Sequence, residues 1–391
     1  EGRAAVKTAA RIAKLPPYLF AEIDKKRREA LARGVDVISL GIGDPDQPSP
    51  DFVVDRLARE ARDPATHGYP PYEGTRDFLQ AVAGYYDRRF AVKLDPEAEI
   101  LALIGSKEGL AHLVWAFVDR GDAALVSDPG YPVYGIHTLL AGGEVVPMPL
   151  LPERGFLPDL GAIHAADRRR ATLMFLCYPN NPTAGTADLG FFREAVDFCR
   201  ENDILLAHDS AYLELTFDGY EAPSILQVEG AKDVAIEFGS LSKPFNMTGW
   251  RLGYAVGNRK AIAALGVVKT NTDSGQFAAI QRAGVEALTN PAARGFIEKM
   301  RGIYARRRDI AVGTLTRLGC PVVKPRGSFY VWAPVPKGHT SASFASHVLD
   351  KVGVIVTPGS AYGGWGEGYF RVSLTLADER LEEALRRLAT C

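Results

Sequence analysis

The chain has 391 residues, a formal net charge of -1 at pH 7, and basic residues dispersed along its length. Because one ordinary core does not grow to this size, two domains are expected. The near-neutral charge gives no reason to expect nucleic acid or an anionic membrane surface as a partner. No run approaches the roughly 18 apolar residues of a membrane helix, and no hydrophobic signal core follows the N-terminus.

Cysteine and histidine usage argues against disulfides and metal sites. The four cysteines, Cys177, Cys199, Cys320 and Cys391, show neither close pairing nor metal-type spacing. This pattern predicts reduced thiols and a cytoplasmic protein. The seven histidines include no pair at helical spacing with an acidic third ligand, so no catalytic metal is predicted.

The N-terminal part of the chain contains two runs that could be misread. The opening EGRAAVKTAARIAK is basic and alanine-rich, and without a serine-rich run or cleavage pattern it predicts an amphipathic arm rather than a targeting segment. The run GIGDPD at residues 41–46 lacks the third glycine of a dinucleotide fingerprint. It continues into prolines instead of a helix, so it does not predict a dinucleotide site.

The middle of the chain alternates apolar strands with amphipathic helices. The predicted strands are ILALIG, AALVSD, GEVVPM, TLMFLCY, DILLAHD, DVAIEFG and RLGYAVG. Residues 188–202 have helical spacing, with the apolar residues largely on one face. Those residues are Phe191, Phe192, Ala195, Val196, Phe198 and Cys199. This βα alternation predicts an α/β fold with a mainly parallel sheet covered by helices on both faces.

The pattern changes after about Val285. A long charged helix is followed by strands around VVKP, SFYVWAP, VIVTP and FRVSL and by two further helices. This mixture predicts a second, smaller α+β domain.

The stretch SLSKPFNMTGWRLGY, residues 240–254, places one lysine in a loop rich in hydroxyl groups and glycine. Lys243 follows an apolar strand, and open α/β sheets bind ligands at strand ends. Burial or a neighbouring cation such as Arg251 lowers the pKa of a lysine and makes its amine nucleophilic towards a carbonyl. Ser240 and Arg251 could hold a phosphate. The alternative is a surface lysine in a turn.

Two other predicted strands end in residues that would complete such a site. Asn181 follows TLMFLCY, and Asp209 and Tyr212 follow DILLAHD. A carboxylate beside a pyridine nitrogen keeps that nitrogen protonated, as pyridoxal phosphate chemistry requires. Asn181 and Tyr212 can donate hydrogen bonds to the phenolate oxygen of the ring. Taken singly, Asp209 could be a helix cap and Tyr212 a core aromatic.

With these residues in this order, the chain resembles the class I/II aminotransferases, the fold-type I pyridoxal-phosphate enzymes, from about Leu15 to the C-terminus. The resemblance rests on Asn181 in NNPTAG, Asp209 and Tyr212 in HDSAY, Ser240 and Lys243 in SLSK, Arg251 in TGWRLGY and Arg371 in YFRVSLT. Within the family, the match is closest to the prokaryotic LL-diaminopimelate aminotransferases. The matching blocks are LPPYLFAEI, GVDVISLGIGDPDQPSP, IGSKEG, SDPGYPVY and FYVWAPVPKGHTSASFA.

The resemblance implies a division into domains and a cofactor. Residues 1–47 would form an N-terminal arm and part of the small domain, and residues 286–391 would form the rest of that domain. Residues 48–285 would form the large domain, with a mainly parallel seven-stranded sheet that binds pyridoxal 5′-phosphate.

Further cofactor-binding residues follow from the resemblance. Ser106 and Lys107 open a helix whose backbone N–H groups and positive end would face the phosphate. Tyr131 would stack on the pyridine ring. Tyr69 would reach the phosphate of the neighbouring subunit, which makes the active site a property of a homodimer, and Tyr72 is the alternative to Tyr69.

Substrate recognition follows from the carboxylate of an amino acid, which a guanidinium binds with two parallel hydrogen bonds. Arg371 is the candidate for this contact, although a strand arginine is more often a solvated residue. The expected substrate-binding residues are Tyr18, Gly43, Lys107, Tyr131, Asn181 and Arg371.

The reaction that the resemblance implies is a ping-pong transamination, in which Lys243 holds the cofactor and then carries a proton from the substrate Cα. The expected donor is LL-2,6-diaminopimelate and the acceptor 2-oxoglutarate, which gives tetrahydrodipicolinate and glutamate in lysine biosynthesis. The chain departs from the diaminopimelate pattern at residues 327–328 and 360–361, near the expected mouth of the site. The alternatives are an aspartate, alanine or aromatic aminotransferase, a C–S lyase on the same fold, and a cofactor-binding regulator.

Overall fold

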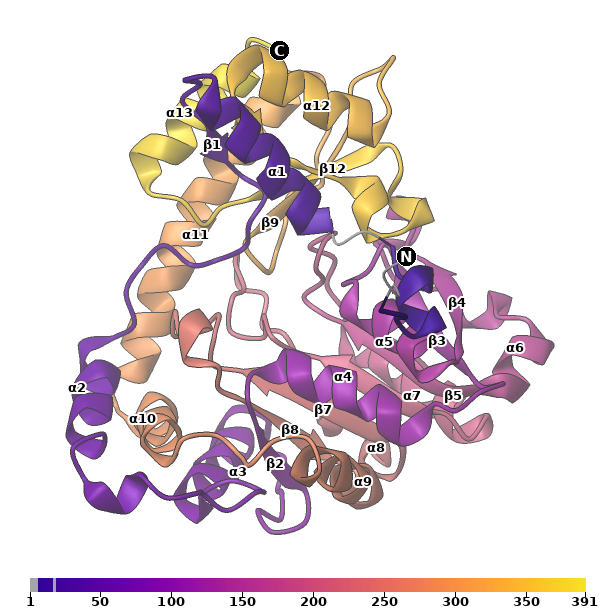
Figure 1. The fold of residues 1–391 in the computed structure, drawn as a ribbon, viewed down its shortest axis with the longest axis vertical. Helices are drawn as coiled ribbons and strands as arrows, with labels where there is room; N and C mark the ends of the chain where they lie inside the picture. The colour runs from indigo at the N-terminus through magenta and orange to yellow at the C-terminus, as the bar shows by residue number, and fades with distance from the viewer. Residues whose placement is uncertain (1–5, 17–18) are drawn as a thin grey trace, which may run out of the picture.

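The computed structural model describes residues 6–16 and 19–391, with the side chains of residues 19–23 left out. The expected substrate residue Tyr18 lies outside the described residues. The molecule has a larger lobe that contains the main sheet and a smaller lobe that contains both α1 (Leu19–Ala32) and the C-terminal helices (Figure 1).

The main sheet has seven strands in the order β2-β8-β7-β6-β5-β3-β4. They are β2 (Ile100–Leu103), β3 (Ala123–Asp128), β4 (Glu144–Pro149), β5 (Ala171–Cys177), β6 (Leu205–Asp209), β7 (Ala235–Ser240) and β8 (Gly253–Gly257). Neighbours pair in parallel except at β8, which runs antiparallel to β2 and β7. The prediction of a mainly parallel seven-stranded sheet is confirmed, and no strand extends more than one residue beyond the run that predicted it.

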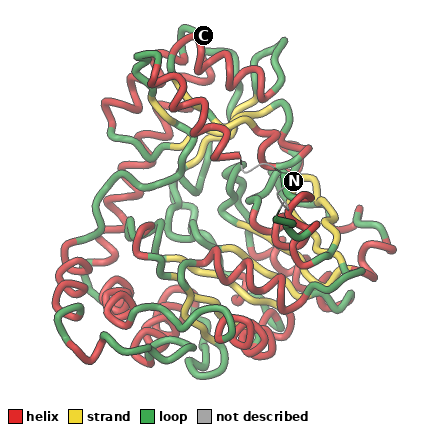
Figure 2. The backbone as a smooth tube through the Cα atoms, viewed as in Figure 1, coloured by secondary structure: helices red, strands yellow, loops and turns green. Residues whose placement is uncertain are grey.

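Helices cover both faces of this sheet, as predicted (Figure 2). Along β5, Leu173 and Phe175 pack with α4, α5 and α9, whereas Met174 and Leu176 pack with α3, α7 and α10. Because successive side chains point to opposite faces, a strand covered on both sides needs a continuous apolar run. The helices are α3 (Arg76–Phe90), α4 (Ser106–Phe117), α5 (Val133–Ala141), α7 (Leu189–Glu201), α9 (Arg259–Thr270) and α10 (Ala278–Thr289).

Helix α7 confirms the helix predicted at residues 188–202. The Asp188 carboxylate accepts a hydrogen bond from the backbone N–H of Phe191 and so caps the helix. All six apolar residues assigned to its inner face are buried. The other helices of this lobe are α2 (Asp51–Glu60), α6 (Ala165–Arg170) and α8 (Ala231–Val234). Short 3-10 turns are η1 (Ala10–Lys14), η2 (Pro64–Thr66), η3 (Pro152–Arg154), η4 (Leu160–Ala162), η5 (Ile225–Gln227), η6 (Thr248–Trp250), η7 (Gly359–Tyr362) and η8 (Gly364–Gly366).

The smaller lobe is built from both ends of the chain. Its elements are α11 (Ala293–Arg317), β9 (Tyr330–Pro334), α12 (Ser341–Val352), β10 (Val354–Ile355), β11 (Thr357–Pro358), β12 (Tyr369–Ser373) and α13 (Asp378–Leu388). From the N-terminal part, β1 (Ile38–Ser39) pairs in parallel with β10, and Ala30 of α1 packs on Leu349 and Ile355. The long helix α11 runs from one lobe to the other (Figure 1). The domain boundaries at residues 47 and 285 stay a prediction.

Two strand predictions in the smaller lobe were wrong. No strand forms at residues 321–325, around VVKP, where Pro321 and Pro325 lack an N–H donor and Val323 is 74% exposed. The run VIVTP is not one strand, because β10 pairs with β1 while β11 pairs with β12 in the sheet β11-β12-β9. Among the helices of residues 6–16 and 19–391, none combines the length and apolarity needed to cross a membrane.

Candidate active site

The site residues predicted from the sequence meet in a cavity of about 420 Å³ at the carboxyl ends of β5, β6 and β7. Those that line it are Gly43, Ser106, Lys107, Tyr131, Asn181, Asp209, Tyr212, Ser240, Lys243, Arg251 and Arg371. Parallel strands bring their carboxyl ends to one edge of a sheet, which is why residues so far apart in the sequence meet there. Their roles stay predictions.

Tyr69 is the described site residue that does not line this cavity. Its side chain is 88% exposed, and it lies in a separate surface hollow beside Pro70 and Pro71. The alternative Tyr72 is also exposed. Both exposed positions are compatible with a contact to a neighbouring subunit, because a side chain that contacts another chain must project from the surface of its own chain.

Lys243 is a buried amine within the cavity. Its Nζ donates a hydrogen bond to the backbone oxygen of Gly43 at 2.9 Å. Burial lowers the pKa of Lys243 from 10.5 to about 8. The cations Arg371 and Arg251 also lower this pKa, whereas the carboxylates of Asp44 and Asp209 raise it. Arg251 acts in the expected direction, but burial is the main cause of the lowered pKa. At neutral to mildly basic pH an appreciable fraction of this amine is therefore uncharged.

Asp209 ends β6 and is buried, and burial raises the pKa of its carboxyl above the ordinary value. The Tyr134 hydroxyl donates to Asp209 Oδ2 at 2.7 Å and opposes that rise. Tyr134 was not singled out from the sequence, although it lies three residues after Tyr131 in SDPGYPVY. Its ring stacks on Phe175 at 4.7 Å, so its position is set by sheet packing rather than by a local pattern.

Arg371 projects from β12 and is 2% exposed, so the alternative of a solvated strand arginine is wrong. Its Nη1 donates to Asn181 Oδ1 at 2.7 Å and its Nη2 donates to the Gly41 oxygen at 2.7 Å. Its Nε has no hydrogen-bond partner within the described part of the chain. A guanidinium carries five N–H donors, so this buried cation retains donors for an anion.

Tyr330 holds two of these residues and was not predicted as a site residue. Its hydroxyl lies 3.0 Å from the Tyr212 hydroxyl, and its ring lies 4.0 Å from the Arg371 guanidinium carbon. A Cβ at Gly43 would collide with the Tyr330 hydroxyl, so only glycine allows this approach. The sequence signal was the block FYVWAP, which was interpreted as a strand and as part of the family resemblance but not as a source of a site residue.

Cationic side chains and helix N–H groups gather at the start of α4. The Gly105 backbone has φ of 76°, and a Cβ there would collide with the Arg251 guanidinium. Arg251 thus packs against the first turn of α4, whose leading N–H groups have no partner within the helix. Burial, and then Arg251, lowers the pKa of the Lys107 ammonium. Proteins bind phosphate with cations, hydroxyl groups and helix N-termini. This part of the cavity offers two cations, the hydroxyls of Ser106 and Ser240 and the start of α4.

An ion cluster around the buried Lys269 adjoins the start of α4. Lys269, 1% exposed, donates to Glu108 Oε1 at 2.8 Å and to Asp273 Oδ2 at 2.9 Å. Glu108 Oε1 also accepts from the Ile104 N–H at 3.0 Å, which holds the segment before α4. Glu108, His112 and Asp273 have ligand atoms close enough for a metal ion. Because the Lys269 ammonium already bonds to both carboxylates, a metal would have to displace it; the absence of a catalytic metal stays a prediction.

Comparisons with known proteins agree with this arrangement. The LL-diaminopimelate aminotransferase of Moorella thermoacetica is 58% identical over 380 residues, which is 97% of each chain. The protein of the same name from Desulforudis audaxviator is 54% identical over 383 residues, covering 98% of this chain and 97% of the relative. The substrate-bound structure of BacF from Bacillus subtilis superposes with a TM-score of 0.94 at 37% identity, covering 99% and 98% of the two chains.

The family model for aminotransferase class I and II matches residues 35–388. This span contains the main sheet, the cavity and all the described residues that line it. The chain belongs to the class I and II aminotransferases.

Proposed function

We propose that this protein transfers an amino group from LL-2,6-diaminopimelate to 2-oxoglutarate, giving tetrahydrodipicolinate and glutamate, with pyridoxal 5′-phosphate as cofactor. The observation that carries the proposal is the meeting of Lys243, Asp209 and Arg371 in one buried cavity. The diaminopimelate assignment is supported by relatives of that name at 58% and 54% identity over nearly the whole chain.

The cavity fits the cofactor on which aminotransferases of this family generally depend. Arg251, Lys107 and the start of α4 supply positive charge and N–H donors for a phosphate. The buried Asp209 carboxylate suits a protonated ring nitrogen, and Lys243 suits the aldehyde carbon. When bound, pyridoxal phosphate supplies an electron sink for the bond cleavage at the substrate Cα.

The other steps, which are substrate binding, proton transfer and charge stabilisation, fall to different side chains of the site. Arg371 binds the α-carboxylate with its Nε and unused Nη hydrogens, and the Tyr330 ring keeps the guanidinium plane in place. Lys243 moves the proton at Cα, for which an amine with a pKa of about 8 is suited near neutral pH. The Asp209 carboxylate stays charged when a cation faces it, because each charge favours the other.

The departures from the diaminopimelate pattern lie outside the cavity. Ser328 is fully buried, and a Cβ at Gly327 would collide with Pro179, so these residues lie in the interior rather than at a mouth. Ser360 and Ala361 line a separate hollow against α12. Neither departure changes a residue that contacts the proposed reacting atoms.

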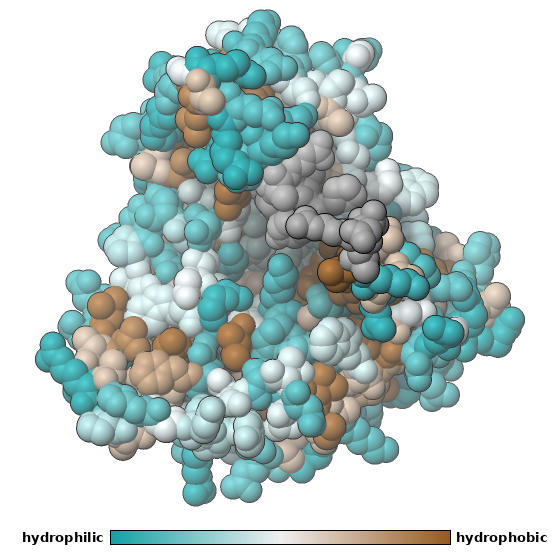
Figure 3. Space-filling model, viewed as in Figure 1, coloured by the Kyte–Doolittle hydropathy of each residue, from teal (hydrophilic) through white to brown (hydrophobic). Residues whose placement is uncertain are grey.

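A homodimer with shared sites is part of the proposal. Tyr69 projects into solvent, and exposed apolar side chains, including Val54 and Phe277, lie on α2 and just before α10. In Figure 3, hydrophobic residues gather over the part of the large lobe where Figure 1 places α2 and α10. The four free cysteines, three of them buried, support a cytoplasmic setting.

An amino-donor panel tests the substrate. LL-diaminopimelate with 2-oxoglutarate should exceed aspartate, alanine and tyrosine by at least roughly tenfold in kcat/KM, or about 1.4 kcal/mol, because a second charged end needs fixed polar partners. Pyridoxal-phosphate absorbance in single turnovers gives the same ranking independently of the acceptor. Equal turnover of aspartate or tyrosine would remove the diaminopimelate assignment and leave the aminotransferase activity standing.

A further inference from the structure

A second cavity, of about 590 Å³, lies behind the candidate active site. It is enclosed by the end of α3, the junction between α10 and α11, and the segments that follow β6 and β7. Ala211 and Ser240 line both cavities. The wall between them is therefore the backbone of residues 209–212 and 240–243, which carries Asp209 and Lys243. We call this second space the rear cavity.

The rear cavity has an apolar floor and a charged rim. Leu213, Leu241, Phe245 and Tyr254 contribute buried surface to the floor. The rim carries one more positive than negative charge, since four arginines and three glutamates line it. A volume of this size, with apolar walls and a few convergent polar groups, is typical of small-molecule sites.

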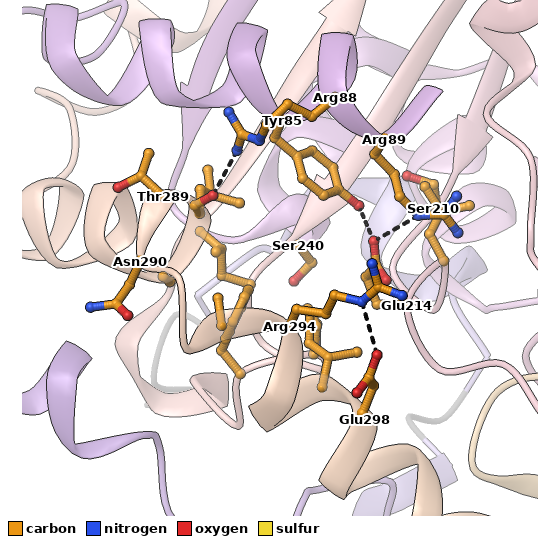
Figure 4. Close-up of a pocket in the computed structure, with 18 of the residues that line it drawn as sticks. Tyr85, Arg88, Arg89, Ser210, Glu214, Ser240, Thr289, Asn290, Arg294 and Glu298 are labelled. Carbon is orange, nitrogen blue, oxygen red and sulfur yellow. Dashed lines mark hydrogen bonds and ion pairs between the residues drawn. The ribbon is translucent and has the colours of Figure 1, made fainter. Parts of the chain in front are cut away.

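Three of the four arginines already face carboxylates. Arg301 donates to Glu214 at 3.1 Å and to Glu221 at 3.1 Å, and Arg89 contacts the same two glutamates. Arg294 pairs with Glu298 at 2.9 Å, at the solvent edge of the cavity. These pairs leave little capacity for a further anion on the three arginines; Figure 4 shows Arg89 beside Glu214 and Arg294 beside Glu298.

Arg88 differs from the other three. It donates from Nη2 to the Leu288 oxygen at 2.9 Å, and it has no ion pair with any carboxylate of the residues that the structure describes. Figure 4 shows the Arg88 guanidinium on the other side of the Tyr85 ring from Glu214. A guanidinium with one of five donors used can bind a carboxylate through two parallel hydrogen bonds.

We propose that the rear cavity binds an amphipathic organic carboxylate, with its carboxylate on Arg88 and its apolar body on the floor, and that this binding is coupled to the active site through Ser240 and Ala211. A ligand there contacts the same backbone that positions Lys243 and Asp209. Coupling of this kind is reciprocal, so the ligand and the cofactor change each other's affinity by the same factor. The inference does not depend on which amino acid is the donor.

The test is calorimetric titration of the holoenzyme with 3-phenylpropionate, and with the neutral 3-phenylpropanamide as the matched probe. Arg88→Gln should weaken binding of the carboxylate by at least about tenfold and leave the amide unchanged. Arg294→Gln is the control, because it removes the same charge from the same rim at a side chain that is 89% exposed and already paired. Arg371→Lys shows which cavity holds the probe, because a probe bound in the active site would lose affinity in this variant and not in Arg88→Gln.

The coupling has its own readout. At saturating 3-phenylpropionate, the dissociation constant of pyridoxal phosphate, measured by absorbance, should shift by about fivefold or more in the parent and not in Arg88→Gln. Thermal unfolding of Arg88→Gln checks that the fold is intact. Failure of the probe to bind, equal binding to Arg88→Gln, or loss of binding in Arg371→Lys would each overturn the site. Binding without any shift in cofactor affinity would overturn the coupling.

Discussion

Two buried carboxylates on neighbouring strands differ in how completely the protein satisfies them. Glu237, in β7, is fully buried, and its oxygens are surrounded by donors. These are Tyr86 Oη at 2.6 Å, His208 Nδ1 at 2.7 Å, Ser224 Oγ at 2.9 Å and Ile225 N at 3.0 Å. A carboxylate accepts about four hydrogen bonds, so Glu237 has no capacity left for a ligand.

Asp209, at the end of β6, retains such capacity. It accepts one short hydrogen bond, from Tyr134, and one long one, from the Ala211 N–H at 3.4 Å. It also lines the cavity, whereas Glu237 does not. A fully hydrogen-bonded buried acid such as Glu237 stabilises the fold. A buried acid with unused acceptor capacity, such as Asp209, can bind a group from outside the chain. Substitutions at and around the two acids should therefore affect different properties.

The largest effect should come from the amine that shares the cavity with Asp209. Lys243→Ala should lower kcat/KM by at least about 10⁴-fold, because the nucleophile and the proton carrier are lost together. Peptide mapping after borohydride reduction of the holoenzyme should locate the cofactor on Lys243. A labelled peptide from another lysine would contradict the assignment of the whole cavity.

Asp209→Asn should lower kcat on the order of 10³-fold with little change in unfolding, because the amide oxygen can still accept from Tyr134 but cannot hold a cation. Steady-state kinetics and urea unfolding are measured on the same preparation. Tyr134→Phe is the matched control, which keeps the carboxylate and should cost less activity. If Asp209→Asn kept most of its activity, the carboxylate would not face the reacting group.

Glu237→Gln should show the opposite pattern. The new amide N–H₂ replaces one acceptor oxygen and leaves a buried donor facing donors, which should lower the free energy of unfolding by about 2–4 kcal/mol. The kcat of the folded fraction should stay within about twofold, since Glu237 does not reach the cavity. Urea unfolding followed by fluorescence gives the first quantity. A large loss of kcat with parental stability would mean that the two acids do not have separate roles.

The smallest effect concerns the pH dependence of the cofactor-free protein. The folded pKa of Lys243, about 8, lies below its ordinary 10.5, so the unfolded chain binds more protons between these values and stability rises with pH there. Below pH 8 the buried amine is charged, and this lowers the free energy of unfolding by about 3 kcal/mol at most. Lys243→Met should therefore be more stable than the parent at pH 7, with the difference shrinking towards pH 10.

Lys269 provides the control for that measurement. It is 1% exposed, more deeply buried than Lys243, and its ammonium bonds to Glu108 and Asp273. Lys269→Met should destabilise the protein at pH 7, because two partly buried carboxylates lose their counter-charge. If both methionine variants were stabilised, burial alone would govern both lysines.

The amino-acid sequence by itself determined the main sheet and predicted many of the residues that line the candidate active site. The parallel strands β3, β5 and β6 lie in apolar runs, because a parallel strand covered on both faces needs apolar side chains in succession. Asn181, Asp209 and Lys243 could be placed at strand ends because turn-forming and polar residues follow those runs directly. Local patterns failed at residues 321–325, where flanking prolines outweighed a β-branched pair.

Only the tertiary structure decided which groups contact one another. Lys243 bonds to Gly43 across 200 residues and Arg371 to Gly41 across 330, and β1 pairs with β10 from the other end of the chain. The contacts of Tyr134 and Tyr330 and the existence of the rear cavity likewise could not be derived from a local pattern. Such contacts depend on how the helices and sheets pack in three dimensions, and the periodicity of a sequence records which face of an element is buried but not what is buried against it.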